Sequence, residues 1–191
     1  MLSPDGRRLA MTTTPIKRGG IPGRSTAGIW DLPSGRQLRS LDADGALAFS
    51  PDGRTLAASH RQRGEILLID PATGKRRRTL TGHPAAVVAL RFSHDGATLA
   101  SADENGTAII WDLATGRAQE TLVGHTAAVT GVAFSPDDRT LYTASGDRSV
   151  LVWDLAGDRR LSRSFTAARR VSSQSFSKKG ALLARGYSNG W

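Results

Sequence analysis

Three residues in the second half of the chain carry the groups of a hydrolase triad. His125, Thr143 and Asp147 supply an imidazole, a hydroxyl and a carboxylate. A histidine that accepts the hydroxyl proton activates that oxygen for attack, and a carboxylate orients the histidine. Catalysis would also need an exposed hydroxyl, an oxyanion site and a substrate cleft, and no motif in the sequence indicates them. The alternative is structural, because buried polar groups must be paired and a chain that includes the indole of Trp153 would satisfy all four groups.

The same residue types occur a second time, 42 residues earlier along the chain. The earlier set is His83, Ser101, Asn105 and Trp111. The duplication therefore directs attention to the elements that position these residues.

Those elements belong to a repeat of about 42 residues. A turn motif opens each copy, as Ser3-Pro4-Asp5-Gly6, Ser50-Pro51-Asp52-Gly53, Ser93-His94-Asp95-Gly96 and Ser135-Pro136-Asp137-Asp138, with a decayed form at Ser177-Lys178-Lys179-Gly180. Two other markers keep the same spacing, namely Trp30-Asp31, Ile69-Asp70, Trp111-Asp112 and Trp153-Asp154, and Gly82-His83 and Gly124-His125. In the turn, proline presets φ, aspartate suits the next position and glycine accepts the strained position that follows. A repeat of this length with these markers indicates β-propeller blades.

The residues between the markers support the same fold class. Short β-favouring runs alternate with turn residues, as in the stretch 86–122. Closely spaced short strands separated by turns favour antiparallel all-β structure. No stretch shows a sustained apolar period of 3.6 residues, so we expect almost no helix.

These motifs resemble the WD40 repeat family over essentially the whole chain, and the segment Trp-Asp-Leu-Ala-Thr-Gly-Arg is similar to bacterial WD40 arrays. The resemblance implies a β-propeller of four-stranded antiparallel blades and a platform for protein–protein contacts without enzymatic activity. It also implies that each set described above is a structural hydrogen-bond tetrad. In the earlier set Asn105 replaces the usual aspartate. The copy before it has lost the tetrad, with Ile69 in place of tryptophan and Ala58 in place of the hydroxyl residue.

The repeat count predicts three full and two partial blades, and therefore an incomplete propeller. The predicted bounds are a partial blade at 1–40 with a loop insertion at 12–27, full blades at 41–80, 83–122 and 125–165, and a partial blade at 166–191. We expect a fragment of a larger signalling or regulatory protein, with a non-functional truncated propeller as an alternative. Open blade edges would also permit self-association.

The composition narrows the remaining functions. The chain has no cysteine, no signal-peptide pattern and no apolar run of membrane-spanning length, so we expect a cytoplasmic protein without membrane contact. Its four histidines do not share a ligand spacing, and no glycine motif has the strand–helix context of a phosphate site. We therefore expect neither a metal nor a cofactor.

The net charge is +9, and the segment 157–191 carries eight basic residues against the single acid Asp158. A basic segment could attract nucleic acid or an acidic protein, although no interleaved aromatic residues suggest base stacking, so nucleic acid is the less favoured partner. In the run Lys75 to Arg78, strand alternation predicts side chains on opposite faces, which argues against a compact phosphate clamp.

Loops between second and third strands are the predicted contact face for a protein partner, because loops on a rigid scaffold concentrate function. The candidate residues there are Arg18, Arg61, Arg63, Glu104 and Arg148. Their predominantly basic character predicts an acidic partner.

Overall fold

The structure is a computed structural model that describes residues 1–14, 25–60, 62–157, 163–166, 171–176 and 183–187, with the backbone alone described beyond residue 157. Every regular element in these ranges is a strand, and neighbouring strands pair antiparallel in chain order. The prediction of an all-β fold is confirmed. The described part of the chain offers no helix long and apolar enough to cross a bilayer.

The strands form five sheets. The first sheet contains β1 (Arg8–Thr13), β2 (Thr26–Asp31) and β3 (Gln37–Leu41). The second contains β4 (Leu47–Phe49), β5 (Leu56–Ser59), β6 (Ile66–Ile69) and β7 (Arg76–Leu80). The third contains β8 (Val87–Phe92), β9 (Thr98–Asp103), β10 (Thr107–Asp112) and β11 (Arg117–Val123). The fourth contains β12 (Val129–Phe134), β13 (Thr140–Ser145), β14 (Ser149–Asp154) and β15 (Arg163–Thr166), and the fifth contains β16 (Val171–Phe176) and β17 (Leu183–Tyr187).

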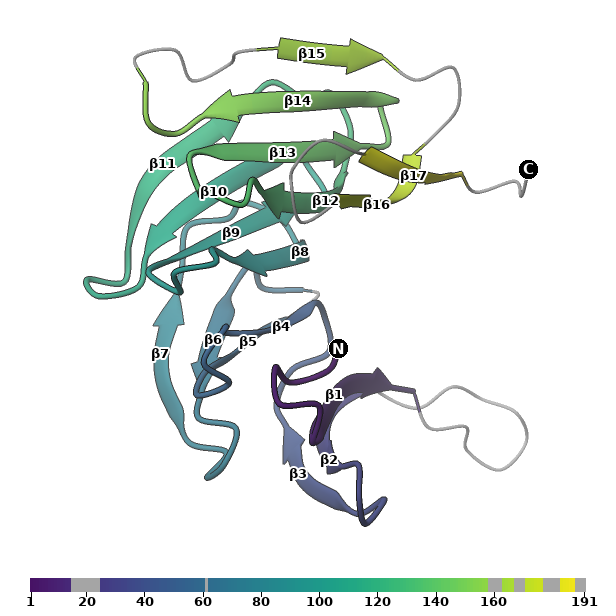
Figure 1. Cartoon of the computed structure of the whole chain (residues 1–191), viewed down its shortest axis with the longest axis vertical. Coiled ribbons are helices and arrows are strands. Elements are labelled where there is room, and N and C mark those ends of the chain that lie inside the picture. The colour runs from purple at the N-terminus through teal and green to yellow at the C-terminus, as the bar shows by residue number, and fades with distance from the viewer. Residues whose placement is uncertain (15–24, 61, 158–162, 167–170, 177–182, 188–191) are drawn as a thin grey trace.

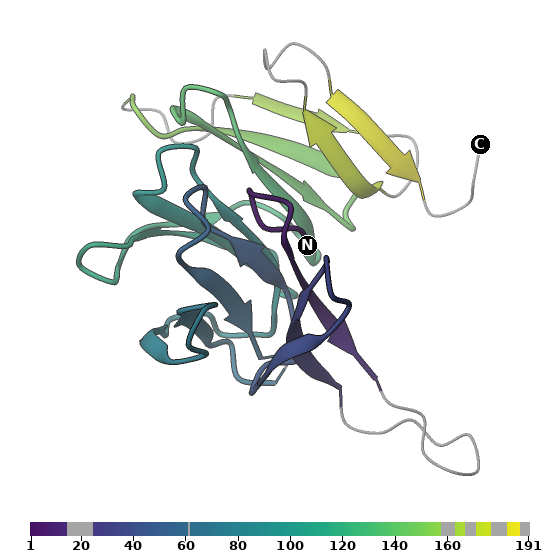
Figure 2. The same ribbon diagram turned by 60° about the horizontal axis from the view of Figure 1, so that its bottom comes forward.

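The sheets follow one another along an arc in chain order (Figure 1). The second, third and fourth sheets each have four strands, and β7 and β11 lie along the outer side of the arc. The fifth sheet lies against β12 and β13 of the fourth (Figure 2).

Apolar layers between the sheets hold the arc together. Ile66, Leu80, Leu99 and Trp111 belong to one buried cluster that joins the second and third sheets. A second cluster joins the third and fourth sheets, and a third cluster joins the first and second. All four residues of β6 are buried because both faces of its sheet are covered, whereas outer strands such as β7 begin with exposed residues.

The four repeated turns have one internal geometry. In the second sheet Ser50 donates its hydroxyl to Asp52 Oδ1 at 2.6 Å and accepts the backbone N–H of Thr55 at 2.9 Å. The fourth residue of each turn has positive φ, including Gly53 at 67° and Asp138 at 57°. The sequence prediction for this motif is therefore confirmed at the strained position.

The loop predicted at 12–27 is shorter than expected. β1 continues to Thr13 and β2 begins at Thr26, and these two residues pair with each other. Residues 15–24 lie outside the described ranges. The glycine and proline content of the stretch favours a loop, but Thr12, Thr13, Thr26 and Ala27 belong to the ladder of β1 with β2.

Candidate functional site

In the fourth sheet, the three residues of the candidate triad lie together with the indole of Trp153. Trp153 on β14 donates its Nε1–H to Thr143 Oγ1 on β13 at 2.9 Å, and this oxygen lies 2.8 Å from His125 Nε2. The other ring nitrogen, His125 Nδ1, lies 2.9 Å from Asp147 Oδ2 in the turn between β13 and β14. Because Thr143 already accepts the indole proton, its own proton points to Nε2, and Nδ1–H is left to donate to the carboxylate.

This order of groups is that of a nucleophile, a base and an orienting acid, but both the hydroxyl and the imidazole are buried. Thr143 is 0% exposed and His125 is 7% exposed. A nucleophile must reach a substrate, and this hydroxyl lies inside the layer between sheets. The four groups therefore satisfy one another as a structural tetrad.

The third sheet contains a tetrad whose acid is a different residue from the one predicted. His83 Nδ1 lies 2.9 Å from Asp103 Oδ2, and His83 Nε2 lies 2.6 Å from Ser101 Oγ. Trp111 donates its indole N–H to Ser101 at 2.7 Å. The prediction of Asn105 as the fourth member is wrong, because Asn105 is exposed.

Strand alternation explains why Asp103 contacts His83 and Asn105 does not. Ser101 and Asp103 are two residues apart on β9, so their side chains leave the same face of the sheet. Asp103 Oδ1 also accepts the backbone N–H groups of Asn105 at 3.0 Å and Thr107 at 2.9 Å. The signal was present in the sequence as an aspartate at i+2 from the hydroxyl residue, whereas alignment with Asp147 favours position 105.

The second sheet has lost the hydroxyl–indole half of the tetrad, with Ala58 and Ile69 buried at those positions. It retains a histidine–aspartate contact with the order reversed. His60, which follows β5, is buried, and its Nδ1 lies 3.6 Å from Oδ1 of Asp44, which precedes β4. In the third and fourth sheets the histidine precedes the first strand, and the aspartate either ends the second strand, as Asp103 does, or follows it, as Asp147 does.

Burial and hydrogen bonding together set the protonation states of His83 and Asp147. Burial lowers the pKa of the His83 ring below its ordinary value, and this outweighs the opposing effect of Asp103. Burial alone would raise the pKa of Asp147, but hydrogen bonds from the Ser149 hydroxyl and the Thr126 backbone hold it well below its ordinary value. A neutral His83 and an ionised Asp147 are suited to fixed hydrogen bonding.

Three predicted partner-contact residues lie within the described ranges. Arg63, Glu104 and Arg148 are all exposed, and they occupy corresponding turns of the second, third and fourth sheets. Arg148 has a φ of 73°, which is unusual for a residue with a side chain. Arg18 and Arg61 lie outside the described residues.

Two further expectations concern ligands. Within the described ranges, His, Asp and Glu side chains do not form a group of three or more that could hold a metal ion. Most of the basic C-terminal residues lie outside the described ranges, and only the backbone is described at Arg163 and Arg185. The binding of nucleic acid or an acidic partner by that segment stays a prediction.

The family model described as "WD domain, G-beta repeat" matches residues 74–112 and 116–154. These two segments are similar to WD40 repeats. The four-stranded antiparallel sheets are consistent with blades of the WD40 β-propeller type. Each WD40 repeat begins at the outer strand of one sheet and continues through three strands of the next, from β7 to β10 and from β11 to β14.

A curated relative supports the WD40 assignment. The chain is 34% identical over 111 residues to "WD repeat-containing protein SL1-17" of Schistosoma mansoni. The alignment covers 53% of this chain and 36% of the relative, so the chain spans about a third of that relative's length. WD40 repeats generally mediate protein–protein interaction.

Proposed function

We propose that this chain is a non-enzymatic scaffold that binds a protein partner. The observation that carries the proposal is the burial of the reactive hydroxyls. Thr143 and Ser101 are 0% exposed, and their hydroxyls are hydrogen-bonded within the tetrads. The groups most capable of catalysis therefore stabilise blades. The polar residues left exposed stand on turns of a rigid array, which is an arrangement suited to contact with another protein.

The partner face that we propose is formed by the loops that carry Arg63, Glu104 and Arg148. Two of these three side chains are basic, so an acidic partner surface would be attracted. We propose in addition that the scaffold belongs to a larger signalling or regulatory protein, which is supported by the alignment to 36% of a longer WD repeat protein. Cytoplasmic location, bacterial origin and self-association through blade edges stay predictions.

The test is affinity capture from a native extract of the source cells. The purified chain is compared with the variant Arg63→Glu/Arg148→Glu and with a matched variant, Arg36→Glu/Arg117→Glu. The matched variant alters the exposed Arg36, which precedes β3, and the exposed Arg117, which begins β11. A partner that is retained by the wild type and the matched variant but lost by the first variant supports the scaffold and its face. Failure to retain any protein above the bead background contradicts the scaffold function.

A further inference from the structure

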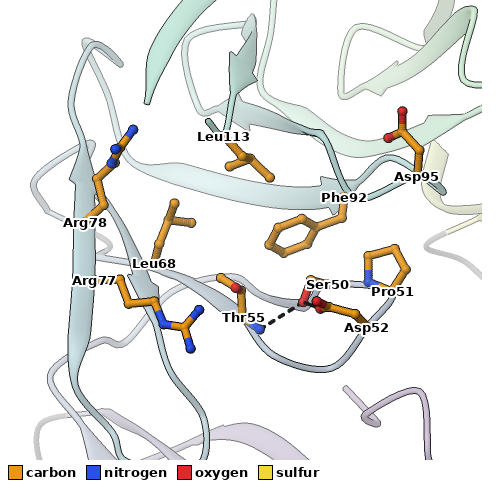
Figure 3. A pocket seen from close by; sticks show the side chains of 11 residues that line it. Ser50, Pro51, Asp52, Thr55, Leu68, Arg77, Arg78, Phe92, Asp95 and Leu113 are labelled. Atoms are coloured by element: carbon orange, nitrogen blue, oxygen red, sulfur yellow. Dashed lines mark hydrogen bonds between the residues drawn. The ribbon is translucent and has the colours of Figure 1, made fainter. Parts of the chain in front are cut away.

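A groove lies between the second and third sheets, on the side of the repeated Ser-x-Asp-x turns (Figure 3). Its volume is about 410 Å³, which is within the usual range of about 300 to 1,000 Å³ for ligand sites. It is lined by Ser50, Pro51, Asp52, Thr55, Leu68, Arg77, Arg78, Phe92, Asp95, Gly96 and Leu113. The groove is distinct from the face that carries Arg63 and Arg148.

A bulge in the outer strand brings two adjacent arginines into this groove. Leu68 pairs with Arg78 and Ile69 pairs with Arg76, so Arg77 is an extra residue in β7. The prediction that alternate side chains of this run separate to opposite faces is wrong here, because a bulge interrupts the alternation. Arg77 and Arg78 both line the groove, at the same end of it in Figure 3.

The two guanidinium groups differ in how their charge is balanced. Arg77 forms an ion pair with Asp70 at 2.6 Å and holds the pKa of that carboxyl at about 2. Arg78 contacts only a neutral acceptor, the carbonyl oxygen of Ala114 in the third sheet, at 3.4 Å. Within the described residues no carboxylate pairs with Arg78, so its charge is available to a ligand.

The other end of the groove is acidic. Asp52 and Asp95 each accept a serine hydroxyl and a backbone N–H on Oδ1. The serine hydrogen bonds lower the pKa of both carboxyls, which are therefore ionised at neutral pH. Leu68, Phe92 and Leu113 lie between the basic and acidic ends (Figure 3).

We propose that this groove binds a short segment of the partner protein with three features: an acidic side chain at Arg78, an apolar side chain at the central leucines and phenylalanine, and a basic side chain at Asp52 and Asp95. This inference rests on the scaffold function proposed above and names a second contact site for it. Charge complementarity at both ends selects an occupant with both signs. A nucleic acid backbone carries one sign only and would be repelled by the two aspartates.

The probe is the peptide Ac-Gly-Glu-Leu-Leu-Lys-Gly-NH2, titrated into the isotope-labelled chain and followed by amide chemical shifts. Arg78→Gln and Asp95→Asn remove one charge each, and Arg36→Gln, at an exposed arginine of the first sheet outside the groove lining, is the matched control. Two further peptides carry glutamine in place of the glutamate or the lysine.

The expected result is a pattern of couplings. Arg78→Gln should lower the affinity for the parent peptide by about two- to five-fold, as expected for a partly exposed ion pair. It should not lower the affinity for the peptide that lacks glutamate. Asp95→Asn should lower the affinity for the parent peptide and leave the affinity for the peptide that lacks lysine unchanged. Arg36→Gln should change the affinity for neither peptide.

Three outcomes would overturn the inference: equal affinity of all variants for all peptides, shifts confined to the loop face, or a stronger response of the groove amides to a single-stranded oligonucleotide than to the peptide. The capture experiment separates this failure from that of the scaffold. Partner capture that survives Arg78→Gln and Asp95→Asn but not Arg63→Glu/Arg148→Glu would retain the scaffold and remove the groove.

Discussion

Asp138 accepts hydrogen bonds from the backbone N–H of His94 at 2.9 Å and from its ring Nδ1 at 2.8 Å, and thereby joins the turns of the third and fourth sheets. Its second oxygen accepts the backbone N–H of Asp95 at 3.0 Å. At the corresponding contact between the first and second sheets, a glycine faces a proline, Gly53 beside Pro4. Gly96 lies beside Pro51 in the same way between the second and third sheets. Proline has no N–H and glycine has no acceptor side chain, so among the described turns of the first four sheets only those of the third and fourth are joined by these hydrogen bonds.

The contact between His94 and Asp138 predicts that substitutions at these two positions are energetically coupled. Asp138→Gly should lower the free energy of unfolding by about 1–2 kcal/mol, because three donors lose their acceptor while glycine relieves the positive φ. His94→Pro should cost much less in the Asp138→Gly background than in the wild type. Urea unfolding of the four proteins measures the coupling, and additive effects would contradict a direct link between the turns.

The identity of the acid in the third-sheet tetrad is testable by comparing neighbours. Asp103→Ala should lower the free energy of unfolding by about 3 kcal/mol, because the His83 ring and two backbone N–H groups lose a buried acceptor. Asn105→Ala should change it by less than about 0.5 kcal/mol, since that side chain is exposed. Thermal and urea unfolding give the comparison, and a larger loss at position 105 would restore the original assignment.

Alanine substitutions at Gly35 and Gly116 test whether the Arg78 side chain lies across the neighbouring sheet. Gly35 and Gly116 have φ values of 67° and 73°, but a Cβ at Gly35 would meet nothing within 4 Å, whereas one at Gly116 would overlap the Arg78 side chain. Each alanine substitution should cost about 1–2 kcal/mol for the backbone conformation.

Gly116→Ala should cost about 1 kcal/mol more than Gly35→Ala, because Arg78 must also move. The double variant Gly116→Ala/Arg78→Ala should recover that difference when urea midpoints are compared. Equal losses for the two glycines would show that Arg78 does not lie across the turn in solution.

Acid should destabilise the fold partly through His83. The folded pKa of this ring is lowered below 6.5, so as the pH falls below about 6.5 the unfolded chain takes up a proton that the folded chain does not. The free energy of unfolding should therefore fall with pH in this window and level off below the folded pKa.

The control for this pH dependence is His83→Gln. This variant should be less stable at neutral pH, but its free energy of unfolding should change less between about pH 7.5 and pH 5.5, because the ring whose pKa is lowered by burial is absent. Urea midpoints across the range provide the slopes. Identical slopes for wild type and variant would remove His83 as the source.

The repeated local features were predictable from the sequence. The turn that contains Ser50 and Asp52 is stabilised by contacts within five residues, so its residue types determine its geometry. The fourth-sheet tetrad was also predictable, because its members keep the residue types and spacing implied by the family resemblance. The all-β class followed from short apolar runs between such turns.

Other features depend on how strands align and how sheets meet. Whether Asp103 or Asn105 reaches His83 is decided by the face from which each side chain leaves β9. A bulge in β7 determines that Arg77 and Arg78 share a groove, since one extra residue reverses the alternation that the sequence predicts.

By itself, the sequence determined the repeat, the turns, the strand class and one complete tetrad, because each of these depends on residue types at short or regularly repeated spacing. The tertiary structure alone decided the reversed contact of His60 with Asp44, the link between His94 and Asp138, and the opposed charges across the groove. The last two depend on the packing of separate sheets, and all three depend on distances between side chains that no local spacing encodes.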